Sequence, residues 1–310
     1  MKNPFYGRDI VSIREFGRED LDHLFRSTDR LRSMRASEKR DLASGRVLGY
    51  LFFESSTRTR LSFEAAMASI GGSSIGIADA KSSSLEKGEN LSDTVRVMDH
   101  YSDVIVLRHQ LDGSSRFAAD VAEKPLINAG SGTEEHPTQA MLDLYTIMKE
   151  KGRINGLRIG IVGDLKYGRT VYSLLYGLTN YDDVEVFLIA PPMLKVRKES
   201  IYEIETKIRT HEQESLDGVL EKLDVVYVTR IQRERFPDPQ EYEKVKGSYV
   251  LDSKVLEGAK DDVIVMHPLP RLQEVGRDID NTPMAKYFRQ VSYGKDLRAA
   301  LLALVLNEGF

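Results

Sequence analysis

Short apolar runs alternate with segments of helical periodicity along nearly the whole chain. Buried strands are typically compact apolar runs bounded by turn residues, and such runs lie at residues 47–53, 104–107, 125–128, 157–162, 184–190, 224–229 and 263–267. Helical spacing follows several of them, as at Leu61, Ala65 and Met67. Because buried strands joined by crossover helices form parallel sheets, we predict an α/β fold with two open parallel-sheet α/β domains.

A break between the two halves is predicted at residues 151–156, where two glycines and a polar tract follow a long helical pattern. The predicted domains are therefore residues 1–150 and 151–289. The last helix, at residues 297–306, is apolar on most of its surface and should be buried. We assign residues 290–310 to the first domain, with packing on the second domain as the alternative.

Composition narrows the class of protein. The 310 residues are 41% hydrophobic with a formal net charge of −4, which excludes a disordered or fibrous chain and implies no nucleic-acid partner. There is no Cys, so disulfides, thiolate zinc sites and thiol nucleophiles are excluded. No apolar run approaches the ~20 residues of a membrane span, and Arg8, Asp9 and Arg14 stand where a signal peptide needs an apolar core. We expect a soluble, cytoplasmic protein with no membrane partner.

Hydroxyl and basic side chains follow the first apolar run, where Ser56, Thr57, Arg58 and Thr59 precede a helical pattern. Free backbone N–H groups and the positive end of the helix dipole make such a junction an anion site. Ser and Thr add short donors, and Arg58 adds a planar fork suited to phosphate. The alternative is ordinary helix capping by Ser or Thr.

Two further strand ends carry candidate donors. Arg108 ends the run at 104–107, and His136-Pro137-Thr138-Gln139 follows the run at 125–128. Pro137 suits the first turn of a helix, whose positive end favours a neutral His136 able to donate to a carbonyl oxygen; capping or packing is the alternative for this histidine. Because the carboxyl ends of parallel strands share an edge, we expect these residues to converge with Arg58 around a small phosphorylated carbonyl compound.

The second half has two arginines at strand ends. Arg169 begins a helical pattern after residues 163–168, which lack the G-x-G-x-x-G spacing of a dinucleotide site. Arg230 and Gln232 follow the run at 224–229 and would share one side if the strand continued. Paired arginines suit a substrate with more than one carboxylate. A solvated charge cluster is the alternative, since residues 233–235 are also charged.

The segment His267-Pro268-Leu269-Pro270-Arg271 closes the last predicted strand. Its two prolines indicate a fixed loop, in which a cis peptide bond can occur. The six histidines of the chain lack metal-ligand spacing and there is no Cys to assist them, so we predict no metal site.

Three of these motifs together resemble the signatures of the carbamoyltransferase family: Ser56-Thr57-Arg58-Thr59-Arg60, His136-Pro137-Thr138-Gln139 and His267-Pro268-Leu269-Pro270. The resemblance covers essentially the full length, and the order and spacing of the motifs make it specific. It implies a two-domain α/β enzyme that transfers the carbamoyl group of carbamoyl phosphate to an amine without a cofactor.

Within the family, the acceptor is typically aspartate or ornithine. The ornithine branch typically has Cys in its His-x-Leu-Pro motif, where this chain has Pro268, and a Ser-Met-Gly-type segment where this chain has residues 229–232. A second arginine, Arg230, suits the side-chain carboxylate of L-aspartate. The resemblance therefore implies N-carbamoyl-L-aspartate and phosphate as products, in an early step of pyrimidine biosynthesis. A carbamoyltransferase for another amine and a non-enzymatic anion-binding subunit are the alternatives.

The resemblance also assigns roles to individual residues. It places the phosphate of carbamoyl phosphate on Ser56, Thr57, Arg58, Thr59 and Arg108; its carbonyl oxygen on Thr59, Arg108 and His136; and its amide on Gln139 and the backbone at Pro268 and Leu269. It places aspartate on Lys87, Arg169, Arg230 and Gln232.

Family membership further implies a homotrimer with shared active sites. A Ser and a Lys from a loop of the neighbouring subunit complete each site; here the Lys is Lys87, and the Ser is assigned to Ser84, with Ser82 and Ser83 as alternatives. Zinc-bearing regulatory chains are further candidate partners, although this chain, without Cys, is not one of them.

Overall fold

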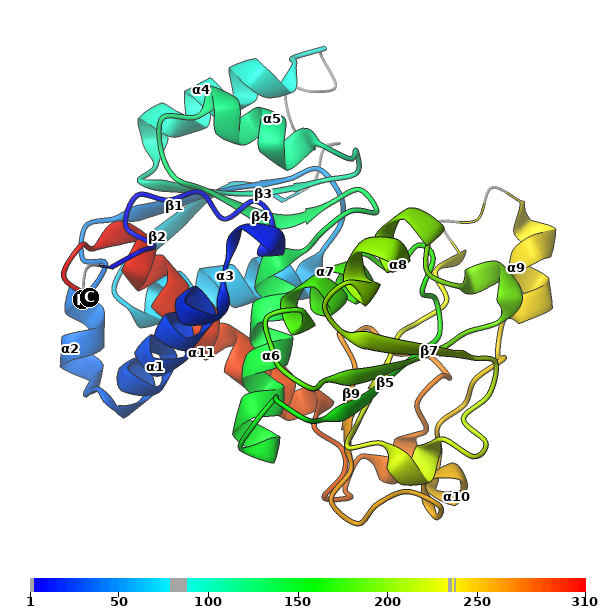
Figure 1. The fold of residues 1–310 in the computed structure, drawn as a ribbon. Helices are drawn as coiled ribbons and strands as arrows, with labels where there is room; N and C mark the ends of the chain where they lie inside the picture. The colour runs from blue at the N-terminus through cyan, green and yellow to red at the C-terminus, as the bar shows by residue number, and fades with distance from the viewer. Residues whose placement is uncertain (1–2, 79–87, 234–235, 237) are drawn as a thin grey trace. The chain divides into compact units, whose positions relative to one another are not determined.

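The computed structural model describes residues 3–78, 88–233, 236 and 238–310, and the chain divides into two compact units (Figure 1). Unit 1 comprises Met1–Leu142 and Ser292–Phe310, and unit 2 comprises Asp143–Val291. Each unit is built on one open sheet whose strands all run parallel. The α/β class and the two parallel-sheet domains predicted from the apolar runs are confirmed.

Unit 1 has a four-stranded sheet in the order β2-β1-β3-β4. Its strands are β1 (Val47–Phe52), β2 (Ser73–Ile77), β3 (Val104–His109) and β4 (Leu126–Ser131). The N-terminal segment lies along β4, where Ile10 N donates to Leu126 O at 2.8 Å and Ile10 O accepts from Asn128 N at 2.9 Å. The central strand β3 is covered on both faces, which explains its unbroken apolar run.

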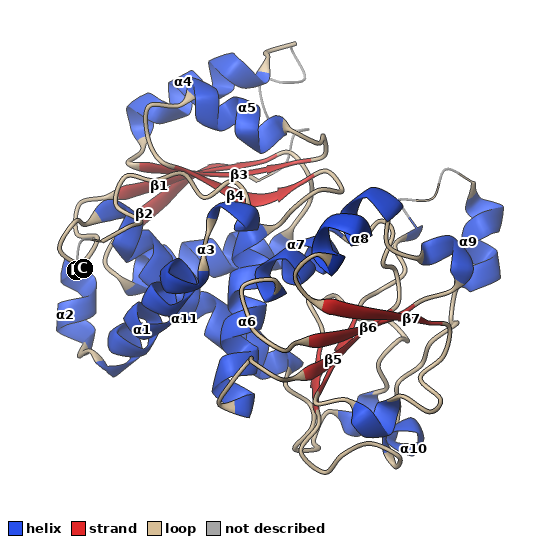
Figure 2. Cartoon of the chain, viewed as in Figure 1, coloured by secondary structure: helices blue, strands red, loops and turns tan. Residues whose placement is uncertain are grey.

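Helices cover both faces of the unit 1 sheet (Figure 2). One face carries α4 (Leu91–Tyr101) and α5 (Ser114–Val121), which bury Leu51, Ile105 and Leu107 together with their own apolar residues. The other face carries α1 (Arg18–Ser33), α2 (Ala36–Asp41), α3 (Thr57–Ser69), the start of α6 (Pro137–Lys151) and the later part of α11 (Tyr287–Leu306). A short 3₁₀ turn, η1 (Ile13–Glu15), precedes α1.

Unit 2 has a five-stranded sheet in the order β7-β6-β5-β8-β9. Its strands are β5 (Arg158–Val162), β6 (Glu185–Ile189), β7 (Arg209–Gln213), β8 (Val225–Val228) and β9 (Ile264–Met266). The helices are α7 (Arg169–Leu178), α8 (Lys198–Glu205), α9 (Pro239–Val245) and α10 (Ser253–Leu256), with 3₁₀ turns η4 (Pro192–Leu194), η5 (Leu220–Lys222) and η7 (Arg277–Ile279).

The four apolar runs in the second half of the sequence predict one strand too few for unit 2. The additional strand, β7, reads Arg-Thr-His-Glu-Gln and is mostly exposed at the edge of its sheet. The edge strand β2 of unit 1 is similarly polar and exposed, and no apolar run marks it. Edge strands need few buried side chains, so hydrophobic patterning does not detect them.

The chain passes from one unit to the other within helices. The described contacts divide the chain at 142/143 in α6 and at 291/292 in α11, whereas the sequence predicts a boundary at the end of α6. The later part of α6 bonds within unit 2, since Asp143 accepts from Tyr227 Oη at 2.8 Å and Lys151 Nζ lies 2.6 Å from Asp262 Oδ2. Helix α11 begins at Tyr287, before the predicted start at 297, and its residues 292–306 belong to unit 1.

Both ends of the described chain are held in unit 1. Asn3 Nδ2 donates to Leu304 O at 2.7 Å, and Gly7 N donates to Val305 O at 3.0 Å. Among the helices that the structure describes, none combines the length and apolar character needed to cross a bilayer.

Candidate active site

The predicted residues of unit 1 gather at the carboxyl edge of its sheet. Strand β1 leads into α3, which begins at Thr57, and Phe52 at its end pairs in register with Arg108 on β3. Strand β4, the other neighbour of β3, leads through residues 132–136 into α6. Three adjacent strands therefore deliver two helix N-termini and one arginine to the same edge, which favours anion binding.

The start of α3 is not capped in the ordinary way. Ser56 is the N-cap residue, but its side chain makes no capping hydrogen bond. The capping alternative requires this hydroxyl to accept a hydrogen bond from a backbone N–H of the helix, and it does not. The two arginines of the motif also differ: Arg60 Nη1 donates to Glu64 Oε1 at 2.9 Å, whereas the Arg58 side chain, two residues earlier, is exposed. This favours Arg58 as the anion-binding arginine.

Arg108 is 9% exposed at the end of the central strand. Its Nη1 donates to Ala129 O at 3.1 Å, and its Nη2 lies 3.4 Å from Glu54 Oε1. These contacts fix the guanidinium plane beside the α3 N-terminus. A guanidinium held in one orientation presents a preorganised fork to phosphate or carbonyl oxygens.

The first turn of α6 is anchored through the residue before it. His136 is 3% exposed and its carbonyl accepts the N–H groups of Gln139 and Ala140. The adjacent Glu135 carboxylate accepts from Ser12 Oγ at 2.5 Å and from Ile13 N at 2.7 Å, which ties the loop to the N-terminal segment. Burial raises the pKa of Glu135 despite these bonds.

In unit 2 a buried carboxylate joins two loops at the carboxyl edge. Asp164 is fully buried after β5; its Oδ1 accepts from Tyr167 N at 2.9 Å and its Oδ2 from Gln232 N at 3.4 Å. Burial raises the pKa of Asp164, and the charge of Arg230 opposes that shift. The sequence prediction gave Asp164 no role, although an acidic residue directly after a buried strand was an available signal.

Asp164 joins the two loops that carry the predicted aspartate-binding residues. Arg169, 8% exposed, is the first residue of α7. Strand β8 ends at Val228, so the strand does not continue to Arg230 and Gln232, which was the condition for placing both on one side. Their loop is held instead by the bond from Gln232 N to Asp164. Arg230 also lines a hollow of about 640 Å³ with Lys246, Arg271 and Arg277.

The segment after β9 adopts a specific loop. The Leu269–Pro270 peptide is cis, one of the conformations that its prolines allow, and Leu269 has a φ of 56°. His267, 1% exposed, accepts Leu269 N–H on Nδ1 at 2.8 Å, and its Nε2 lies 2.9 Å from Glu274 Oε1. Since β8 and β9 are neighbours, this loop and the Arg230 loop leave the sheet side by side.

The structure thus groups the predicted residues into two sets. Ser56, Thr57, Arg58, Thr59, Arg108, His136 and Gln139 lie at the carboxyl edge of unit 1, and Arg169, Arg230, Gln232, Pro268 and Leu269 at that of unit 2. Lys87 and Ser84, with Ser82 and Ser83, lie outside the described residues.

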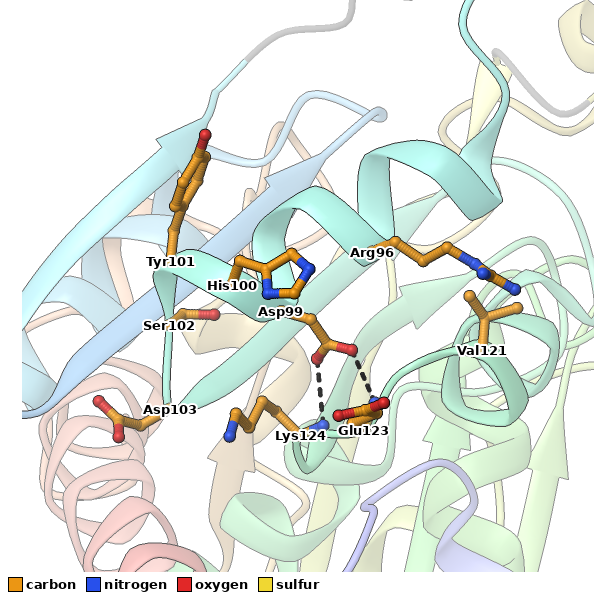
Figure 3. A pocket seen from close by; sticks show the side chains of 9 residues that line it. All are labelled: Arg96, Asp99, His100, Tyr101, Ser102, Asp103, Val121, Glu123 and Lys124. Carbon is orange, nitrogen blue, oxygen red and sulfur yellow. Dashed lines mark hydrogen bonds between the residues drawn. The ribbon is translucent and has the colours of Figure 1, made fainter.

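Unit 1 has a hollow of about 620 Å³ at the opposite, amino-terminal edge of its sheet (Figure 3). Asp99 on α4 points across it and accepts Glu123 N at 2.7 Å and Lys124 N at 3.1 Å, which fixes the turn into β4. None of the predicted residues lines it.

Anion sites at the carboxyl edges of two separate parallel sheets are characteristic of a two-domain α/β enzyme that acts on small anionic substrates. Residues 8–149 match the family model described as aspartate/ornithine carbamoyltransferase, carbamoyl-P binding domain, and residues 155–305 match the Asp/Orn binding domain of the same family. The chain therefore belongs to the aspartate/ornithine carbamoyltransferase family.

Full-length relatives support the assignment. The chain is 64% identical over 305 residues to the aspartate carbamoyltransferase catalytic subunit of Cenarchaeum symbiosum, covering 98% of each chain, and 61% identical to that of Nitrosopumilus maritimus, covering 99% of each. A crystal structure of aspartate transcarbamoylase from Trypanosoma cruzi with carbamoyl phosphate and aspartate matches with a TM-score of 0.94, at 40% identity and 98% coverage of both chains. The family resemblance predicted from the three motifs is confirmed.

Proposed function

We propose that this chain transfers the carbamoyl group of carbamoyl phosphate to the α-amino group of L-aspartate, giving N-carbamoyl-L-aspartate and phosphate. The observation that carries the proposal is the overlap of nearly the whole chain with catalytic subunits of aspartate carbamoyltransferases, one of them 64% identical. The geometry agrees, because arginines stand at the substrate edges of both sheets.

Unit 1 is the proposed carbamoyl-phosphate domain. The phosphate binds the α3 N-terminus through Ser56, Thr57, Arg58 and Thr59, with Arg108 beside it. Thr59, Arg108 and His136 donate to the carbonyl oxygen. Gln139 and the carbonyl groups of Pro268 and Leu269 accept from the carbamoyl amide. Two observations support these roles: the Ser56 side chain makes no capping hydrogen bond, and the guanidinium of Arg108 is held by Ala129 O.

Unit 2 is the proposed aspartate domain. Arg169, Arg230 and Gln232 bind the two carboxylates, and Asp164 holds both loops that carry them. An arginine that meets a carboxylate in a fixed orientation makes charge-assisted, bidentate bonds. This arrangement favours aspartate over ornithine, whose side chain ends in an ammonium group.

The reaction follows from these positions. The deprotonated amine attacks the carbamoyl carbon, a C–N bond forms, and the carbonyl electrons move onto the oxygen that Thr59, Arg108 and His136 stabilise. Collapse of the tetrahedral intermediate breaks the bond to phosphate, which leaves with the electron pair and accepts the ammonium proton. Positioning and oxyanion stabilisation supply the rate enhancement.

The assembly is also part of the proposal. We expect a homotrimer in which Ser84 and Lys87 of the neighbouring subunit complete each site, with zinc-bearing regulatory chains as further candidate partners. The cytoplasmic location stays a prediction of the sequence.

The test is a product assay. The purified chain is incubated with carbamoyl phosphate and either L-aspartate or L-ornithine, and the products are identified by mass spectrometry. We expect carbamoyl aspartate and no citrulline. Turnover with ornithine alone would replace the proposed acceptor, and absence of turnover with either would contradict the proposal.

A further inference from the structure

The segment Pro268-Leu269-Pro270 is unusual in the hydrogen-bonding groups that it offers. Proline has no backbone N–H, so Leu269 carries the only N–H of the three residues. Pro268 and Leu269 are half-buried, and no donor among the described residues reaches their carbonyl oxygens. If the Leu269 N–H is engaged elsewhere, a ligand that binds this segment meets only carbonyl acceptors.

His267 removes that last donor. The Leu269 N–H donates to His267 Nδ1 at 2.8 Å, so Nδ1 carries no proton. The proton of the neutral ring therefore lies on Nε2, which is 2.9 Å from Glu274 Oε1. Burial lowers the pKa of His267, which agrees with a neutral ring donating to an ionised Glu274.

The ring is itself held in place from two directions. Glu274 also accepts from Leu272 N at 3.1 Å, which closes the loop from 267 to 274. On the other side, His267 N donates to Gln290 Oε1 at 3.0 Å, and Gln290 Nε2 donates to the buried Asp143 at 2.6 Å. The Leu269 φ of 56°, which residues other than glycine seldom adopt, is thus maintained by bonds on both sides of His267.

We propose that His267 is a positioning residue that makes Pro268–Leu269 an acceptor-only surface, and that this surface selects an amide-bearing acyl phosphate over one bearing a methyl group. The inference rests on the proposed function. Two carbonyl acceptors complement the two N–H donors of the carbamoyl amide, whereas the methyl group of acetyl phosphate leaves both acceptors unpaired. A site built for a hydrogen-bonded group rejects the analogue that lacks it. A free Leu269 N–H would oppose the carbamoyl amide, donor against donor.

Two substitutions separate the functions of the ring nitrogens. The Oδ1 of Asn stands near the position of His Nδ1, so His267→Asn keeps the acceptor for Leu269 N–H. The amide of Gln reaches the position of Nε2, so His267→Gln keeps the bond to Glu274 and releases Leu269. His211→Gln is the matched control, because His211 is a half-exposed histidine on the edge strand β7.

The readouts are the KM for carbamoyl phosphate and the competitive inhibition constants of acetyl phosphate and inorganic phosphate. In His267→Gln we expect the KM to rise about tenfold, as for one lost hydrogen bond, while both inhibition constants change less than about twofold. In His267→Asn we expect the KM to stay within about threefold of wild type, and in His211→Gln all three constants to be unchanged.

Several results would overturn the inference. Equal weakening of all three ligands in His267→Gln would indicate general disruption of the site. An equal rise in KM for the Asn and Gln variants, or no rise for either, would contradict the proposed role of Nδ1 as acceptor of the Leu269 N–H. Independently of any variant, ¹⁵N NMR of histidine-labelled wild-type protein should show His267 with an unprotonated Nδ1, and a protonated Nδ1 would contradict the proposal. A wild-type chain without turnover would contradict the proposed function instead, and the NMR result would still decide the tautomer.

Discussion

Identical residue types a few positions apart have different surroundings in this chain. Arg58 and Arg60 stand in one motif, yet Arg60 pairs with Glu64 on the next turn of α3 while Arg58 is exposed near the start of the helix. The difference in surroundings comes from position on the helix, because residues two apart point in different directions.

We predict that Arg58→Ala lowers kcat by about 10³-fold or more, since it removes a charged donor at the developing phosphate. Arg60→Ala, the matched control, loses an i,i+4 ion pair worth about 0.5 kcal/mol and should leave kcat within a few-fold of wild type. Steady-state kinetics measures both. Comparable losses in the two variants would contradict the assignment of Arg58.

Arg230→Ala should act on aspartate alone. The loss of a charge-assisted bond costs about 1.5–3 kcal/mol, so the aspartate KM should rise about 10- to 100-fold while the KM for carbamoyl phosphate changes little. The control is Arg233→Ala, which removes an exposed arginine of the same loop. Normal aspartate saturation in the Arg230 variant would refute its role.

His267 should make stability depend on pH. Its pKa is lowered by burial, with Glu274 opposing and with Arg271 and Arg230 adding to the shift. Between the lowered pKa and the ordinary value of about 6.5, the unfolded chain binds more protons than the folded one, so stability rises with pH there. The stability advantage of wild type over His267→Asn should be full above about pH 6.5 and shrink as the pH falls. Urea midpoints from pH 5 to 8 measure it, and a constant difference would contradict the assignment.

At the scale of elements, the close approach of two backbone segments restricts which residues can stand where two strands lead into their loops. Gly163 directly follows β5 and has a φ of 118°. A Cβ at this position would lie 2.2 Å from the carbonyl oxygen of Thr229, the residue after β8. Asp164 N donates to Thr229 Oγ1 at 3.1 Å directly beside this contact. The glycine therefore permits the loop pairing that carries Asp164 and Arg230.

Gly163→Ala should destabilise the protein by more than the cost of placing Ala at a positive φ, because the added Cβ also clashes with Thr229 O. Gly218→Ala is the control, because Gly218 also has a positive φ, 69°, but a Cβ there meets nothing within 4 Å. We expect a loss of about 1 kcal/mol for the control and about 3 kcal/mol or more for Gly163→Ala, with a raised aspartate KM only in the latter. Thermal unfolding and kinetics together measure this, and equal losses would remove the steric argument.

At the scale of the whole molecule, the two units each carry part of the proposed substrate set. A bisubstrate analogue that joins a phosphonate to aspartate should bind tightly, and a Trypanosoma cruzi relative has been crystallised with N-(phosphonacetyl)-L-aspartic acid. A ligand at a thousand times its Kd stabilises the folded state by about 4 kcal/mol. We therefore expect a clear rise in Tm with the analogue, and a smaller one with phosphate or aspartate alone. Equal shifts for the analogue and for phosphate would show that the aspartate half of the analogue adds nothing to binding.

The sequence by itself determined much of this protein. Its buried strands, the helices after them and the order of the three motifs depend on local patterns: apolar runs, turn residues and helix starts. Together these predicted the fold class, the family and the two sets of site residues. The absence of Cys and the second arginine, Arg230, distinguished the aspartate branch from the ornithine branch.

Only the tertiary structure decided the remaining features, because they depend on contacts between residues far apart in the chain. The polar edge strands β2 and β7 exist through pairing with a neighbour and need no apolar pattern. Asp164 gains its role from Gln232 on another loop, and the proton of His267 is placed by Leu269 and Glu274 together. Hydrogen-bond partners and strand neighbours are properties of the folded chain, so no local pattern specifies them.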